Sequence, residues 1–107
     1  MRVLVSFDRN HHAYGDAIAR AIEDYRPHLD VSVARSQSFA VELSRLRPEV
    51  VISDKPKAAG KAAAWVELTT DPDPVSRICV GGRCRRSRNP SFDELLAVVD
   101  EAEDLSG

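Results

Sequence analysis

Residues 48–56, with the sequence PEVVISDKP, decide the fold that we expect for this chain. Three consecutive β-branched residues, Val50, Val51 and Ile52, are followed at once by Ser53 and Asp54. An unbroken apolar run of this kind predicts a central strand that is covered on both faces. In an open sheet of parallel strands, ligands bind just beyond the carboxyl ends of the strands. Asp54, which directly follows the run, is therefore the first candidate for a functional residue.

The first half of the chain alternates between strand and helix patterns. Residues 2–7, RVLVSF, predict a second buried strand, and Asp8 follows that strand as Asp54 follows the other. Apolar residues at helical spacing predict helices over 17–25 and 39–46, and residues 29–34 alternate as a strand does. Ser36 or Ser38 can cap the second helix. Such alternation is typical of right-handed crossovers, so we expect strands one to three to be parallel, with helices on the faces of the sheet.

The second half predicts shorter connections. Residues 63–70, AAWVELTT, indicate a fourth strand, and residues 77–82, RICVGG, a fifth. The link DPDPVS between them contains two prolines, which exclude a helix, and its length suits a hairpin-like return. We therefore expect the fifth strand to be antiparallel to the fourth. Gly81 and Gly82 predict a two-residue turn into a short returning strand, and Ser91 predicts the N-cap of an amphipathic closing helix.

Length and composition restrict the class of protein. The chain of 107 residues predicts a single domain over residues 1–107, and its formal net charge of -2 predicts neither nucleic-acid nor membrane binding. The N-terminal apolar run is too short for the apolar region of a signal peptide, and no run approaches the roughly 18 residues of a membrane span, so we expect a cytoplasmic protein. The predicted hairpin places Cys79 opposite Cys84. In a reducing cytoplasm we expect two free thiols, and a redox pair is the alternative.

Three segments resemble the receiver domain of response regulators. RVLVSFD is similar to the first strand of that family, and PEVVISD is similar to its third strand, which ends in the phospho-accepting aspartate. NPSFDELLAVVDEA is similar to its last helix. The likeness covers residues 1–56 and the closing helix, and it implies a flavodoxin-like α/β fold and a role in signal transduction.

Carried over residue by residue, the resemblance makes Asp54 the phosphoacceptor, Asp8 a magnesium-binding acid and Thr69 the hydroxyl after the fourth strand. Phe7 stands where the family has another acid, which implies weak Mg²⁺ binding because carboxylates hold the ion that offsets phosphoryl charge. Arg88 falls at the position of the family's lysine, for which arginine is not a simple replacement. We therefore expect a stand-alone, degenerate receiver-like domain that acts through contacts with a partner protein, with phosphorylation of Asp54 left open.

The arginines near the second glycine turn suggest a different function. Five of them lie within twelve residues: Arg77, Arg83, Arg85, Arg86 and Arg88. Strand alternation puts Arg83 and Arg85 on one face, where they could bind a small anion or a nucleotide. A solvated edge strand that resists aggregation is the structural alternative. Together with Asp8 and Asp54, these arginines make a small α/β enzyme or anion-binding protein the second functional hypothesis.

Asp8 and Asp54 also have two interpretations. They could form a site for a divalent metal such as Mg²⁺, or they could be strand-end carboxylates that accept hydrogen bonds from loop backbone. Adjacent histidines, His11 and His12, follow closely. Because neighbouring side chains at a helix start point in different directions, we expect them to lie in a solvated loop rather than to bind a metal.

Overall fold

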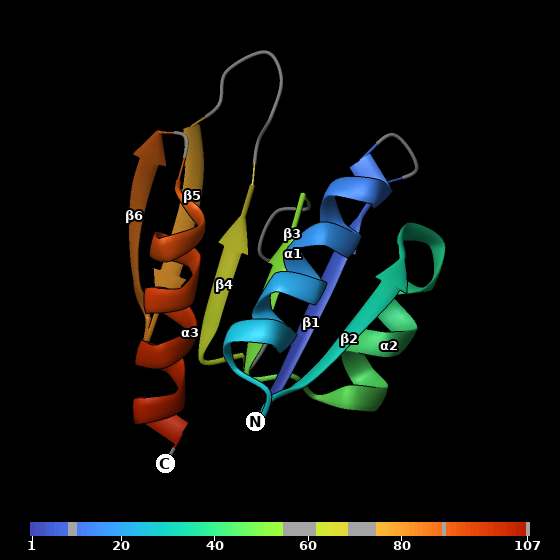
Figure 1. Cartoon of the computed structure of the whole chain (residues 1–107), viewed down its shortest axis with the longest axis horizontal. Helices are drawn as coiled ribbons and strands as arrows, with labels where there is room; N and C mark the ends of the chain where they lie inside the picture. Colours follow the sequence, from blue (N-terminus) through green and yellow to red (C-terminus); the bar gives the residue numbers. More distant parts are fainter. Residues whose placement is uncertain (9–10, 55–61, 69–74, 89, 107) are drawn as a thin grey trace.

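The computed structural model describes residues 1–8, 11–54, 62–68, 75–88 and 90–106 (Figure 1). A mixed sheet of six strands, in the order β2-β1-β3-β4-β5-β6, forms its centre. The strands are β1 (Arg2–Phe7), β2 (Asp30–Arg35), β3 (Val50–Ser53), β4 (Ala64–Glu67), β5 (Val75–Val80) and β6 (Arg83–Arg88). The helices are α1 (His12–Tyr25), α2 (Phe39–Leu46) and α3 (Phe92–Ser106), and a 3₁₀ turn, η2 (Ser36–Ser38), precedes α2.

The strand directions agree with two predictions, one made from the alternation of strands and helices and one from the short link before the fifth strand. β1 pairs in parallel with β2 and β3, and β3 pairs in parallel with β4. β5 is antiparallel to β4, and β6 is antiparallel to β5. The parallel arrangement of the first three strands is therefore confirmed, as is the antiparallel hairpin at the end of the sheet. The link before β5 explains the reversal, because residues 68–74 are seven, fewer than the ten (54–63) that join the parallel strands β3 and β4, and a parallel crossover usually needs about a dozen.

The central strand β3 is buried on both faces, as its sequence predicted. Val50 and Ile52 belong to the apolar cluster under α1 and α3, while Val51 belongs to the cluster under α2. All three side chains are 0% exposed. Figure 1 shows α1 and α3 side by side on the near face of the sheet and α2 on the far face. Trp65 packs in the α2 cluster, where its ring meets Phe39 edge to face at 5.9 Å.

The hairpin of β5 and β6 contains a disulfide bond. Gly81 and Gly82 have φ angles of 57° and 83°, so they form the predicted turn, which requires two residues with positive φ. The resulting register places Cys79 opposite Cys84, with Cα atoms 4.0 Å apart, and the two sulfur atoms are bonded. Our expectation of two free thiols was therefore wrong. The turn explains the bond because it fixes the register in which Cys79 and Cys84 form a closely spaced cross-strand pair, whose side chains meet.

The helix ends follow the predicted signals in part. Ser91 caps α3, because its Oγ accepts a hydrogen bond from the backbone N–H of Glu94 at 3.1 Å. Ser38 occupies the N-cap position of α2, but its side chain makes no capping hydrogen bond, so the predicted cap is wrong there. α2 ends at Leu46, and its C-cap residue Arg47, just before Pro48, has the left-handed conformation. Within the described residues, no helix is both long and apolar enough to span a lipid bilayer.

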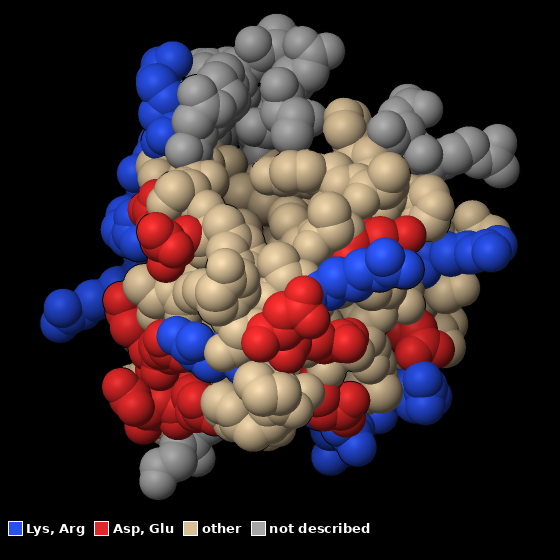
Figure 2. All heavy atoms as spheres, viewed as in Figure 1, with Lys and Arg blue, Asp and Glu red and all other residues tan. Residues whose placement is uncertain are grey.

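Opposite charges gather on neighbouring elements at one end of the sheet. The sequence of α3 contains acidic side chains and no basic one: Asp93, Glu94, Asp100, Glu101, Glu103 and Asp104. The sequence of β6 contains four arginines and no acid. Figure 2 shows the acidic side chains over the lower left of the molecule, where α3 lies, and basic side chains along the upper left edge. The near-zero net charge therefore conceals a local separation of charge.

Candidate functional site

Asp8 and Asp54 meet at the carboxyl edge of the sheet. They directly follow β1 and β3, which are parallel neighbours with Ser6 in register with Ser53. The backbone N–H of Asp8 donates a hydrogen bond to Oδ2 of Asp54 at 2.9 Å. The structure thus brings together the two carboxylates that the sequence placed at this edge. The same hydrogen bond means that Asp54 also stabilises the chain where it leaves β1.

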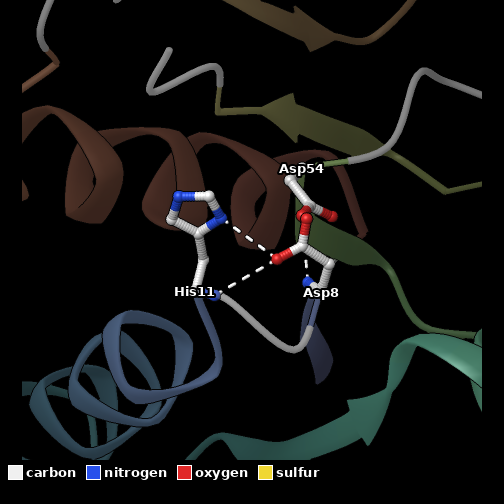
Figure 3. A group of neighbouring side chains, drawn as sticks. All are labelled: Asp8, His11 and Asp54. Atoms are coloured by element: carbon white, nitrogen blue, oxygen red, sulfur yellow. Dashed lines mark hydrogen bonds and ion pairs between the residues drawn. The ribbon is translucent and has the colours of Figure 1, made fainter.

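His11 is the third residue of this group. It occupies the N-cap position of α1, where its backbone N–H donates to the carbonyl oxygen of Asp8 at 3.0 Å. The imidazole Nδ1 lies 3.1 Å from Oδ1 of Asp8. Figure 3 shows the three side chains converging from the ends of two strands and the start of a helix. His11 therefore contacts an acid, although we expected a solvated loop; the three-residue spacing from Asp8 was the available signal.

The geometry of Asp8, His11 and Asp54 suits a divalent cation. One ligand atom from each side chain lies within 4.8 Å of the other two. The side chains of His11 and Asp8 are 37% and 46% exposed, so a hydrated ion can reach them. Mg²⁺ typically binds one or two carboxylates and keeps several waters, whereas an imidazole ligand favours transition metals such as Zn²⁺. The group can therefore supply three ligands to such an ion.

Phe7, which stands at the position of the second acid in receivers, is a core residue. Its side chain is 4% exposed and meets Tyr14 edge to face, with ring centroids 5.5 Å apart. It packs so closely under α1 that a Cβ atom on Gly15 would lie 2.6 Å from Cδ2 of Phe7. The end of β1 therefore contributes a single carboxylate, that of Asp8, to the group.

Of the two remaining residues predicted from the receiver resemblance, Arg88 is not brought to this group. Thr69 lies outside the described residues. Arg88 ends β6, which runs in the same direction as β3 and so reaches the same edge of the sheet. Two strands separate β6 from β3, and at about 4.8 Å per strand the separation is roughly 14 Å. An arginine side chain on β6 is too short to cross that distance to Asp54.

Arg83 and Arg85, the predicted anion ligands, share one face of β6, and that face is turned toward α3. Arg85 donates a hydrogen bond from Nη1 to Oε1 of Glu94 at 2.7 Å, and Ser87 donates from Oγ to Oε2 at 2.9 Å. These two hydrogen bonds, that of Arg85 foremost, lower the pKa of the Glu94 carboxyl. The charge of Arg85 is thus already matched by an acid of α3.

Comparisons with known proteins found no match for this chain, either among protein-family models or among curated proteins and solved structures. Of the groups described above, the one formed by Asp8, His11 and Asp54 lies where ligands bind in open sheets of parallel strands.

Proposed function

We propose that this chain is a receiver-like signalling domain that binds a divalent cation through Asp8, His11 and Asp54 and acts by contact with a partner protein. The observation that carries the proposal is the convergence of three ligand atoms within 4.8 Å at the ends of adjacent parallel strands. Neither a single acid at a strand end nor a histidine at a helix start would by itself suggest a cation site. The convergence of these residues from the ends of two strands and the start of a helix does suggest one.

The order of the strands supports this proposal. The first five strands lie in the order β2-β1-β3-β4-β5, which is also the order of flavodoxin-like doubly wound sheets. In such sheets the ligand site lies beyond β1 and β3, where the strand order reverses, and Asp8 and Asp54 occupy that place. The antiparallel β5 and the added β6 are departures from that fold. They lie on the other side of β4 from the proposed cation site.

In this proposal, phosphorylation of Asp54 is a slow reaction and secondary to cation binding. Phosphoryl transfer depends on positioned cations that offset the developing charge. Here Phe7 supplies no carboxylate, and Arg88 lies two intervening strands away from β3. We therefore expect slow modification that requires high Mg²⁺. Cation binding and protein contact are the main routes by which the domain would signal.

The cation site can be tested with a matched pair of histidine variants. His11 and His12 are adjacent, and each lies near an aspartate: His11 Nδ1 is 3.1 Å from Asp8 and His12 Nδ1 is 3.3 Å from Asp16. The proposal requires that His11→Ala weaken Zn²⁺ binding by roughly tenfold or more, as judged by calorimetry, because an imidazole ligand is lost. His12→Ala is the control and should bind normally. Equal affinity in both variants would contradict the role of His11.

A separate experiment tests the phosphoryl-acceptor part of the proposal. The protein is incubated with acetyl phosphate and Mg²⁺ and weighed intact over time beside an Asp54→Asn variant. We expect slow, partial addition of one phosphoryl group that the variant lacks. Rapid and complete addition would show that having Phe7 in place of an acid does not slow the phosphorylation of Asp54. Addition that persists in the variant would remove Asp54 from the proposal.

A further inference from the structure

The hairpin of β5 and β6 presents a second group of chemically active side chains, away from α3. Its register pairs Arg77 with Arg86 and Cys79 with Cys84. These pairs are two residues apart along each strand, so all four side chains share one face. The intervening residue Arg85 contacts Glu94 of α3 and therefore marks the opposite face. The arginine pair and the disulfide thus lie together on the face that α3 does not cover.

The pairing of Arg77 with Arg86 is electrostatically unfavourable. Like charges directly opposite each other on neighbouring strands destabilise a sheet. Among the residues that the structure describes, neither guanidinium forms an ion pair, although Glu67 stands opposite Arg77 across β4 and β5. Arg85, which precedes Arg86 in β6, differs from this pair, because Glu94 of α3 matches its charge. A negatively charged ligand would relieve the repulsion between Arg77 and Arg86.

A groove joins this arginine pair to the disulfide. It has a volume of about 320 Å³ and is lined by Arg77, Cys84 and Arg86 of this face and also by Arg85, which lies between Cys84 and Arg86 in the sequence. That volume is at the lower end of the range for small-molecule sites. Cys84 is exposed, whereas Cys79 is 3% exposed. An incoming small molecule would therefore meet the sulfur atom of Cys84 first.

We propose that this groove binds an anionic low-molecular-weight thiol, and that the Cys79–Cys84 disulfide accepts its electrons. The ligand thiolate attacks Sγ of Cys84 and forms a mixed disulfide, while the bond between Cys84 and Cys79 breaks and its electron pair goes to Sγ of Cys79. A second ligand thiolate then attacks the ligand sulfur of the mixed disulfide and releases the Cys84 thiolate. Two thiols are oxidised to one disulfide, and the two cysteine thiolates take up protons.

The two arginines favour each stage of this reaction. A carboxylate on the ligand can form paired hydrogen bonds with a guanidinium, which favours an acidic thiol over a neutral one. Nearby positive charge raises the local concentration of the attacking thiolate. It also lowers the pKa of a cysteine thiol, and a leaving group with a lower pKa departs faster. Arg77 and Arg86 stand two residues from Cys79 and Cys84, so they can act on both sulfur atoms.

This activity is independent of the proposed cation site, because the groove is formed by β5 and β6 and shares no residue with Asp8, His11 and Asp54. Failure of one proposal therefore leaves the other intact.

Reduction kinetics with thiols of different charge test the proposal. Mercaptosuccinate, 2-mercaptoethanol and cysteamine serve as the anionic, neutral and cationic probes, with each rate corrected for thiolate fraction and nucleophilicity. Trp65 lies opposite Cys79 in the register, so its fluorescence can follow the reaction, and intact mass identifies the product. We expect the anionic thiol to react about tenfold faster than the neutral one at low salt, and the advantage to shrink at high salt. Equal corrected rates would overturn the proposal.

Variants assign the preference to particular arginines. Replacing Arg77 and Arg86 together with Gln should abolish the advantage of mercaptosuccinate. The rate with 2-mercaptoethanol should fall less, because that thiol has no carboxylate to bind a guanidinium. Arg83→Gln is the matched control, because Arg83 neighbours Cys84 in sequence but lies on the opposite face of β6. It should keep the preference. A preference that survives in the double variant, or that is lost equally in the control, would overturn the assignment; the salt series on the unmodified protein tests the proposal even if the double variant fails to fold.

Discussion

Gly15→Ala tests the close packing of α1 on β1 beside the proposed cation site. An added Cβ would lie 2.6 Å from Cδ2 and 3.4 Å from Cγ of Phe7, and the first distance is too short for carbon atoms. The ring cannot simply rotate away, because it is 4% exposed and packs against Tyr14. Either the ring or the helix must therefore move.

Two opposing effects set the size of the change. Forcing an extra methyl group into a packed core costs about 1–3 kcal/mol. Replacing Gly with Ala inside a helix stabilises it by about 1 kcal/mol. The net expectation for Gly15→Ala is a loss of roughly 1 kcal/mol in the free energy of unfolding. For a domain near this size, that loss lowers the melting temperature by about 4–8 °C.

The assay is urea unfolding of a double-mutant cycle with Phe7→Leu. The smaller side chain lacks the ring atom that obstructs the new methyl group, so in the Phe7→Leu background Gly15→Ala should stabilise the protein by about 1 kcal/mol. The expected result is thus a reversal of sign between the two backgrounds. If Gly15→Ala changes stability equally in both, the contact with Phe7 does not explain the glycine.

Three further predictions concern side chains elsewhere in the fold. Ser6 is 0% exposed and its Oγ has no hydrogen-bond partner among the described residues, so Ser6→Ala should raise the free energy of unfolding by about 1 kcal/mol in urea titration. Arg26 donates hydrogen bonds to both carboxylate oxygens of Asp100 and lowers the pKa of that carboxyl. The pair therefore stabilises the fold at pH values above the pKa of an unfolded aspartate. This stabilisation is lost as the pH falls through the lower pKa of the folded state. Asp100→Asn should therefore melt below the wild type at neutral pH and converge with it in strong acid. Arg85→Gln should raise the pKa of the Glu94 carboxyl in an NMR titration, and an unchanged pKa would contradict the ion pair.

The amino-acid sequence by itself determined the strands and their directions where local chemistry was decisive. The apolar run of Val50, Val51 and Ile52 sufficed to identify the central strand, because burial on both faces requires such a run. The short proline-containing link before β5 was enough to predict the antiparallel return, because a crossover needs more residues. Gly81 and Gly82 similarly predicted the turn, since few other residues adopt positive φ.

Tertiary structure alone decided which side chains meet. The contact of His11 with Asp8 depends on where α1 begins relative to the end of β1, and hydrophobic spacing does not encode that placement. The pairing of Arg85 with Glu94 depends on where α3 lies over the sheet. The Cys79–Cys84 bond depends on the hairpin register, which brings the two sulfur atoms together. The expectation of free thiols had relied only on the reducing conditions of a cytoplasm. In each case the physical reason is that side-chain contacts depend on the relative placement of whole elements, whereas sequence patterns report the preferences of each element separately.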